Sequence, residues 1–150
     1  MIYSTKSAEE TEELGRTLAE KLCTGKVDSA FIALRGEMGV GKTAFVRGFA
    51  SFFGILGVKS PTYTVVNEYR GSCNIFHFDM YRIESEDDLL SIGFDDYVRR
   101  RGFSIAEWSE NVEDFLPDDL ITVTISRVPT DTDERKIEIA LDEKYDNISI

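Results

Sequence analysis

Residues 36–43 have the types and spacing of a phosphate-binding loop. Their sequence, GEMGVGKT, fits the pattern G-x-x-x-x-G-K-[ST]. Glycines let the backbone curl so that successive N–H groups point at phosphate oxygens, and a helix that follows adds the positive end of its dipole. In such a loop Lys42 supplies a cation for the outer phosphates, and the Thr43 hydroxyl is placed to ligate Mg²⁺. A glycine-rich turn beside an ordinary lysine would match the same pattern, so the flanking elements must decide.

The two elements that such a loop requires flank the motif. Residues 30–34 (AFIAL) form an apolar run that is long enough for one buried strand. Residues 44–53 can form a helix, since Phe45, Phe49 and Phe52 recur at helical spacing and fall near one face. A strand before the loop and a helix after it favour nucleotide binding over the simple turn.

Acidic residues at the ends of predicted strands could complete a Mg²⁺-nucleotide site. Hydrolysis needs acids that hold Mg²⁺ and orient water, and ligands of open α/β sheets sit beyond the carboxyl ends of the parallel strands. Asp79 ends one predicted strand, and Glu107 ends another beside Trp108. From the residues alone, Asp79 could instead be a turn residue and Glu107 a surface carboxylate. Trp108 could pack in the core or at its rim.

Five further polar residues have both a functional and a structural interpretation. Thr62 and Thr64 follow the helix of the loop, where phosphate-loop proteins can carry a switch that contacts the γ-phosphate or Mg²⁺. They could equally begin a strand. Lys59 and Arg82 are cations that could approach a phosphate, although such residues are more often solvated. His77 lies mid-strand, which favours a hydrogen-bonded structural histidine over a catalytic base.

The composition predicts a soluble globular protein. The chain has 150 residues, of which 42% are hydrophobic and 30% charged. No apolar run approaches the ~20 residues of a membrane span, and the start lacks the basic and apolar regions of a secretory signal, so a cytoplasmic location is expected. Cys23 and Cys73 lack the neighbours of a metal site, so we expect reduced thiols and find no support for zinc.

The net charge of −11 and the pI near 4.5 bear on the choice of partner. Nucleic-acid backbones attract Lys and Arg, so this chain should bind RNA or DNA poorly by itself. A basic protein partner or a Mg²⁺-nucleotide fits the charge better.

The order of predicted elements indicates an α/β fold. Ser7 and Glu10 form a capping box that opens an amphipathic helix through about Leu22. The other predicted elements are strands at 63–70, 73–79, 103–106, 120–125 and 136–141, short helices at 84–93, 94–100 and 111–115, a turn at 128–133 and a frayed polar tail after residue 142. We therefore predict one P-loop NTPase-like domain over residues 1–150. It is a three-layer sandwich with a mixed, centrally parallel sheet and antiparallel hairpins.

Several stretches together resemble the bacterial TsaE family (formerly YjeE), the small ATPases of tRNA threonylcarbamoyladenosine biosynthesis. The stretches are the phosphate loop, VRG at 46–48, SPTY at 60–63, HFDMYR at 77–82 and EW at 107–108. The S-P-T-[FY] and H-F-D-x-Y-R stretches are quite specific to that family, and the C-terminal hairpin is less diagnostic. The resemblance covers the chain from residue 7 to about residue 117.

This resemblance implies an activity, cofactors and partners. Family members bind ATP or ADP with Mg²⁺ and hydrolyse ATP weakly by themselves. They join the proteins TsaB and TsaD, which build threonylcarbamoyl on the adenosine next to the anticodon. The ATPase serves the turnover or remodelling of that complex and does not perform the transfer.

The resemblance also implies roles for individual residues. Thr43 and Glu107 would ligate Mg²⁺, and Asp79 would act at the Mg²⁺ or at the attacking water. Thr62 to Thr64 would be switch-like. The other expected nucleotide contacts are Trp108, Thr11 on the adenine side, and the loop residues Glu37, Met38, Gly39, Val40, Gly41, Lys42, Thr43 and Ala44. Glu37 and Met38 replace the commoner Asp-Leu pair, which matters little because these positions contribute mainly backbone N–H groups.

Two other functions remain open at this point. A small-molecule or nucleoside kinase could use the same loop, but it usually adds a lid with several arginines. The only arginine cluster here, residues 99–101, fits the end of a helix. A nucleotide-switched binding module with negligible turnover overlaps with a weak ATPase.

Overall fold

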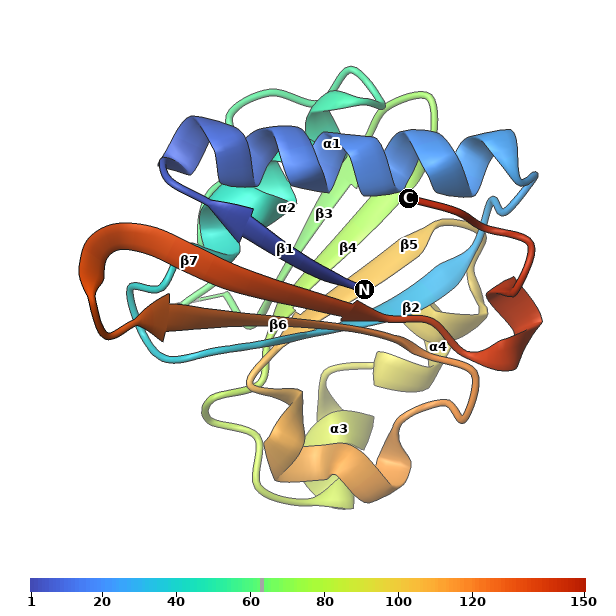
Figure 1. The fold of residues 1–150 in the computed structure, drawn as a ribbon. Coiled ribbons are helices and arrows are strands. Elements are labelled where there is room, and N and C mark those ends of the chain that lie inside the picture. Colours follow the sequence, from blue (N-terminus) through green and yellow to red (C-terminus); the bar gives the residue numbers. More distant parts are fainter. Residues whose placement is uncertain (63) are drawn as a thin grey trace.

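A seven-stranded mixed sheet forms the middle layer of the computed structural model, which describes residues 1–62 and 64–150 (Figure 1). Across the sheet the strands follow the order β1 (Ile2–Thr5), β7 (Asp131–Ala140), β6 (Ile121–Val128), β2 (Ala30–Arg35), β5 (Phe103–Glu107), β4 (Asn74–Asp79) and β3 (Val66–Arg70). The four central strands are parallel, whereas β7 and β3 run antiparallel to their neighbours. The predicted fold class is therefore confirmed.

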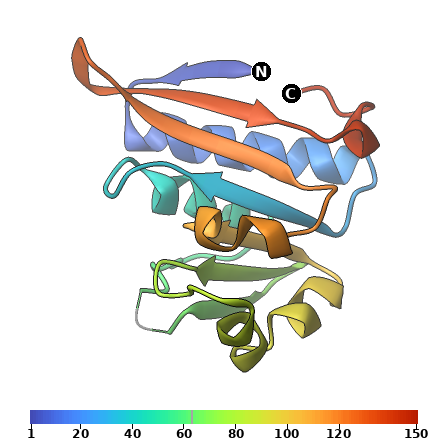
Figure 2. The same ribbon diagram turned by 90° about the horizontal axis from the view of Figure 1, so that it is seen from below.

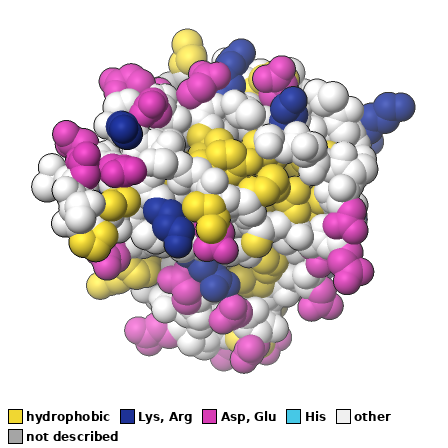
Figure 3. Space-filling view, viewed as in Figure 1, with side chains coloured by type: hydrophobic (Ala, Val, Ile, Leu, Met, Phe, Trp, Pro, Cys, Tyr) yellow, Lys and Arg dark blue, Asp and Glu magenta, His cyan; other side chains and the backbone are white. Residues whose placement is uncertain are grey.

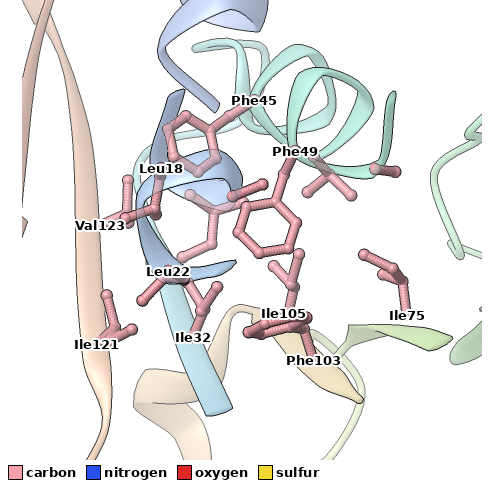
Figure 4. Close-up of a cluster of buried hydrophobic side chains, with 14 of the residues drawn as sticks. Leu18, Leu22, Ile32, Phe45, Phe49, Ile75, Phe103, Ile105, Ile121 and Val123 are labelled. Carbon is pink, nitrogen blue, oxygen red and sulfur yellow. The ribbon is translucent and has the colours of Figure 1, made fainter. Parts of the chain in front are cut away.

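Helices cover both faces of this sheet. One face carries α1 (Ala8–Thr24) and α2 (Lys42–Ser51), and the other carries α3 (Glu86–Ser91), α4 (Phe94–Arg99) and the 3₁₀ helix η1 (Ser109–Phe115) (Figure 1, Figure 2). Successive residues of a strand point to opposite faces, so β2 supplies both cores. Ile32 belongs to the α1–α2 core, where it lies near Leu22 and Ile105 (Figure 4), and Phe31 belongs to the core under α3 and α4.

The helices α1 and α2 touch backbone to backbone through two glycines. A Cβ atom on Gly48 would lie 1.8 Å from the Glu12 carbonyl oxygen, and one on Gly15 would lie 2.3 Å from the Phe45 carbonyl oxygen. No larger residue fits either position without a shift of backbone. This close contact holds the first turns of α1 beside the helix that begins at the phosphate loop.

The N-terminal segment differs from the prediction, which contained no strand before the first helix. Ile2–Thr5 forms β1 and pairs antiparallel with β7. The predicted helix is confirmed, since the Ser7 side chain accepts from the Glu10 N–H. Glu10 Oε2 accepts from the Lys6 N–H at 2.5 Å, one residue before the cap.

The C-terminal prediction is wrong in two places. The turn predicted over 128–133 is shorter, because β7 already begins at Asp131. The tail predicted to be frayed is packed: it forms the 3₁₀ helix η2 (Glu143–Tyr145), and Tyr145 and Ile148 are only 1% and 7% exposed. Their apolar surface joins the α1–α2 core, and this burial offsets the entropy of ordering the tail.

The remaining differences concern boundaries. The strand expected from residue 63 begins at Val66, and Tyr63 itself lies outside the described residues. The helix expected at 44–53 begins at Lys42, inside the loop motif. Across the described residues, none of the helices has the length and apolar character that crossing a membrane requires. Cys23 and Cys73 carry free thiols.

Candidate nucleotide-binding site

The loop between β2 and α2 presents backbone N–H groups to its surroundings. Gly39 and Gly41 have φ angles of +75° and +116°, a region that favours glycine. Gly41 precedes α2 and provides no side-chain cap, so the first N–H groups of the helix keep their hydrogen-bonding capacity for another acceptor. Such a helix start is an anion-binding position.

A cavity of about 500 Å³ opens on this loop, within the size range of small-molecule sites. It contains ten of the residues predicted to bind nucleotide or metal. They are Met38, Gly39, Gly41, Lys42, Thr43, Ala44, Thr62, Asp79, Glu107 and Trp108. Residues that are far apart in the sequence are therefore brought to one cavity, as the hypothesis of a nucleotide site requires.

The register of the parallel strands explains why the two acids meet the loop. Glu107 of β5 lies beside Leu34 of β2 on one side and beside Asp79 of β4 on the other. The carboxyl ends of these strands thus share one edge of the sheet, and the loop leaves β2 at the same edge. The Met80 N–H donates to the Glu107 carbonyl oxygen at 2.9 Å, which extends the pairing just past the strands.

Lys42 is enclosed beside this edge, with only 6% of the residue exposed. Its Nζ donates to the Gly36 carbonyl oxygen at 2.6 Å and lies 4.2 Å from the centre of the Trp108 ring. Burial lowers the pKa of Lys42, and the nearby charges of Glu107, Glu110 and Asp79 oppose that shift. The lysine is therefore a largely desolvated cation that faces an acidic edge.

The two acids are held by different donors. The Asp79 Oδ1 atom accepts from the Tyr81 N–H at 3.0 Å, so a tight turn fixes this half-buried carboxylate. The buried Glu107 Oε2 atom lies 2.6 Å from His77 Nε2. Both arrangements restrict the carboxylates without occupying all their oxygen lone pairs.

A second cavity of about 440 Å³ lies on the other side of the loop and shares Gly39, Gly41 and Ala44 with the first. Thr11 and Val40, both predicted as contacts, line this second cavity. The Thr11 hydroxyl is 2.8 Å from the Thr5 hydroxyl, so the unpredicted strand β1 helps to place it.

Two predicted residues lie outside both cavities. Glu37 forms an ion pair with Arg127 at 3.1 Å, and the Thr64 hydroxyl donates to Asn67 Oδ1 at 2.7 Å. Thr62 does line the first cavity, where its hydroxyl is 2.8 Å from the Ser60 hydroxyl. Of the segment that the resemblance marks as switch-like, Thr62 thus lies at the first cavity, together with the neighbouring Ser60.

Comparison with known proteins supports the resemblance found in the motifs. The family model described as threonylcarbamoyl adenosine biosynthesis protein TsaE matches residues 5–137. The chain belongs to the TsaE family. A Bacillus subtilis (strain 168) protein named tRNA threonylcarbamoyladenosine biosynthesis protein TsaE is 34% identical, over 98% of this chain and 96% of that protein.

A second relative agrees in sequence, and a solved structure agrees in fold. A Treponema pallidum protein of the same name is 34% identical, over 91% of this chain and 97% of that protein. The crystal structure of Bacillus subtilis YdiB superposes with a TM-score of 0.79 at 28% identity, covering 98% of this chain and 89% of that one. The matches extend through the C-terminal hairpin, which the motifs alone did not reach.

Sequence reasoning missed several residues that line the two cavities of this TsaE family member. Val65 and Tyr81 line the first cavity, and Asp133 and Arg135 of β7 line the second. Val65 and Trp108 have φ angles of +69° and +59°, which is unusual for residues other than glycine and concentrates backbone strain beside the cavity. Tyr81 lies within the HFDMYR stretch and Val65 lies two residues after SPTY, so these stretches could have pointed to both residues. No signal marks the two β7 residues.

The residues at the first cavity fit a magnesium ion that arrives with a nucleotide. Within residues 1–62 and 64–150, no group of three or more His, Cys, Asp or Glu side chains could hold a metal ion alone. Mg²⁺ is commonly held by phosphates, water and only one or two protein carboxylates, so this donor set suffices once phosphates are present. Thr43, Asp79 and Glu107 line the cavity and supply oxygen donors of the kind that Mg²⁺ prefers.

Proposed function

We propose that this chain binds ATP and ADP with Mg²⁺ in the loop cavity and hydrolyses ATP slowly in the service of tRNA threonylcarbamoyladenosine biosynthesis. One observation carries the proposal: Lys42, Thr43, Asp79 and Glu107 line one cavity at the start of α2. Membership of the TsaE family and the names of its relatives support the pathway.

Each residue has a role that follows from its position. The loop N–H groups and Lys42 bind the phosphates. The positive φ angles of the loop glycines hold these N–H groups in an arrangement that fits phosphate oxygens. Thr43 and Glu107 would hold Mg²⁺, which when bound neutralises charge that develops on the phosphate oxygens. Asp79, fixed by the Tyr81 N–H, orients the attacking water.

The hydrolysis is proposed to drive a conformational step in a complex with TsaB and TsaD in the cytoplasm. Ser60 and Thr62 lie at the cavity, on the segment that leads to β3. The conformation of this segment can therefore depend on whether a γ-phosphate is bound. A slow intrinsic rate suits such a role, because turnover then depends on the assembled partners.

Calorimetry with MgADP and MgATP tests the site. We expect Lys42→Ala to weaken nucleotide binding by at least about a hundredfold, since it removes the buried cation of the loop. Lys21→Ala, an exposed lysine at the end of α1, serves as the control and should bind like the wild type. Unchanged affinity in Lys42→Ala would refute the site.

Reconstitution tests the pathway. The reaction contains TsaB, TsaD, the enzyme that forms the carbamoyl-adenylate, tRNA and ATP, with and without this chain. We expect several rounds of modification per complex only when the chain is present. Equal multi-turnover modification without it would refute the function, and stoichiometric phosphoryl transfer to a small acceptor would favour a kinase.

A further inference from the structure

We propose that His77 is a positioning residue for the Mg²⁺-nucleotide site: it holds one oxygen of Glu107, so that the other oxygen faces the cavity. This inference rests on the proposed function. It assigns a role at the site to a histidine whose place in mid-strand indicated only a structural one.

Strand geometry places His77 on the same face as the two acids. Residues of β4 alternate between the faces, so His77 and Asp79 point toward α2, whereas Phe76 and Phe78 point into the opposite core. In the parallel register, His77 lies beside Ile105, and Asp79 lies beside Glu107. Glu107 is thus two residues along β5 from the partner of His77 and is within reach of its ring.

The contact is short and enclosed. His77 Nε2 lies 2.6 Å from Glu107 Oε2, the His77 side chain is 0% exposed, and the Glu107 side chain is 9% exposed. Among the described residues, His77 Nδ1 has no hydrogen-bond partner. A buried N–H without an acceptor is costly, so the hydrogen resides on Nε2 and is donated to Glu107.

This donor settles which oxygen of Glu107 is available. A glutamate side chain has three rotatable bonds, and an unanchored one loses conformational entropy when it binds a metal. With Oε2 bound to His77, Oε1 is the oxygen free for Mg²⁺ or for a water bound to it. Removal of the group that hydrogen-bonds to a metal-ligating side chain commonly weakens metal binding by about 10–100-fold.

Two variants separate positioning from packing. His77→Gln retains an N–H donor near the position of Nε2, whereas His77→Leu keeps the apolar volume and removes the donor. We measure ADP affinity by calorimetry at a series of Mg²⁺ concentrations and in EDTA. We expect His77→Leu to require about tenfold more Mg²⁺, with ADP affinity in EDTA within about twofold of the wild type, and His77→Gln to recover most of the Mg²⁺ dependence.

Three results would overturn the role of His77. They are an unchanged Mg²⁺ dependence in folded His77→Leu, an equal loss of affinity in EDTA, or a loss in His77→Gln as large as in His77→Leu. Failure of the proposed function looks different, because the wild type itself would then bind no ADP. In a Glu107→Gln background, His77→Leu should have little further effect on the Mg²⁺ dependence.

A spectroscopic test on the wild-type chain avoids any loss of folding. The chain has one histidine, so ¹⁵N-histidine labelling gives the signals of the His77 ring alone. We expect the tautomer with hydrogen on Nε2, and a shift of its Nε2 signal when Mg²⁺ is added to the ADP complex. Hydrogen on Nδ1, or signals unmoved by Mg²⁺ while ADP is bound, would contradict the proposal.

Discussion

Lys42 has two partners in this structure that phosphate groups would replace. Its Nζ is bound to the Gly36 carbonyl oxygen and lies over the Trp108 ring. A cation over an indole ring is worth about 0.5–2 kcal/mol, less than its contact with a doubly charged phosphate in the same enclosed place. We therefore infer that the lysine leaves the ring when a nucleotide binds.

The fluorescence of Trp108 should report this change. The chain contains one tryptophan, so its emission comes from Trp108. We expect MgADP to change that emission with the same concentration dependence as binding measured by calorimetry. Lys42→Met, which cannot place a cation over the ring, should show a smaller change at saturating nucleotide, because only the contact of the nucleotide with Trp108 remains. An equal change in Lys42→Met at saturating nucleotide would contradict the inference.

At the scale of single residues, the sequence predicted what is local and missed what depends on register. Lys42 and Thr43 are fixed by a short motif, and their positions at the cavity follow from it. The contact of His77 with Glu107 joins residues 30 apart and exists because β4 and β5 are parallel neighbours in one register. Arg135 lies just before the strand predicted at 136–141, and it lines the second cavity because β7 begins earlier, at Asp131.

At the scale of elements, the contact between α1 and α2 should tolerate no side chain at Gly48. An added Cβ would lie 1.8 Å from the Glu12 carbonyl oxygen, so one helix must move. We expect Gly48→Ala to lower the free energy of unfolding by about 1–3 kcal/mol, although alanine favours a helix by about 1 kcal/mol. Urea unfolding measures the change.

A neighbouring position on the same helix provides the control. Arg47 is exposed and forms an ion pair with Glu12, so Arg47→Ala should cost less than about 1 kcal/mol. A Gly48→Ala protein as stable as the wild type would show that the two helices can separate freely.

The packed tail predicts a second effect at this scale. Tyr145 is 1% exposed and Ile148 lies against the end of α1, where a Cβ on Gly25 would be 2.1 Å from Ile148 Cδ1. We expect Tyr145→Ala to cost about 3 kcal/mol in the free energy of unfolding, because it leaves a cavity in the core. MgADP affinity of the folded variant should be unchanged, since the phosphate loop lies near the opposite end of α1.

Lys144→Ala controls for the loss of tail contacts at the surface. Lys144 pairs with Asp119 at 2.7 Å and is largely exposed, so its removal should cost less than about 1 kcal/mol. If Tyr145→Ala unfolds at the wild-type urea concentration, the tail does not contribute to the core.

The elements that carry apolar residues in a recognisable pattern were predicted, whereas the strand β1 and the packed C-terminal tail were not. The strand β2 and the helices α1 and α2 carry apolar residues at the spacing of their structure. The strand β1 has only four residues, too few to show alternation. The tail looks polar because its few apolar residues are isolated, and their burial depends on the far end of α1.

At the scale of the whole molecule, ion pairs between distant segments make stability depend on pH. Arg100, at the end of α4, donates to Glu68 of β3 and lowers the pKa of that carboxyl; Lys144 lowers the pKa of Asp119 in the same way. A lowered pKa in the folded state means that the stabilisation is present above the ordinary values of 4.5 and 3.8. It is lost as the pH falls through the folded-state values.

The urea midpoint measures this dependence. Between about pH 5 and pH 3 we expect the midpoint of Glu68→Gln to fall less steeply than that of the wild type, because glutamine does not titrate. Protonation of the other carboxylates reduces the net negative charge of both proteins, and its effect cancels in the difference between their urea midpoints. Parallel curves for the two proteins would show that the pair with Arg100 contributes nothing.

The overall charge of −11 leads to the last prediction, that this chain binds tRNA poorly by itself. On the face that carries α1 and β1, acidic side chains surround the margin, and lysines and arginines are scattered among them (Figure 3). RNA binding needs several cations that act together on the phosphates, so scattered ones give little affinity. By fluorescence anisotropy at about 150 mM salt, we expect a dissociation constant for tRNA above about 100 µM, with or without MgATP. Affinity near 1 µM that falls steeply with salt would show that the chain grips the RNA directly. The expected result would mean that this chain contributes to the tRNA modification through contacts with partner proteins and not through direct binding of the tRNA.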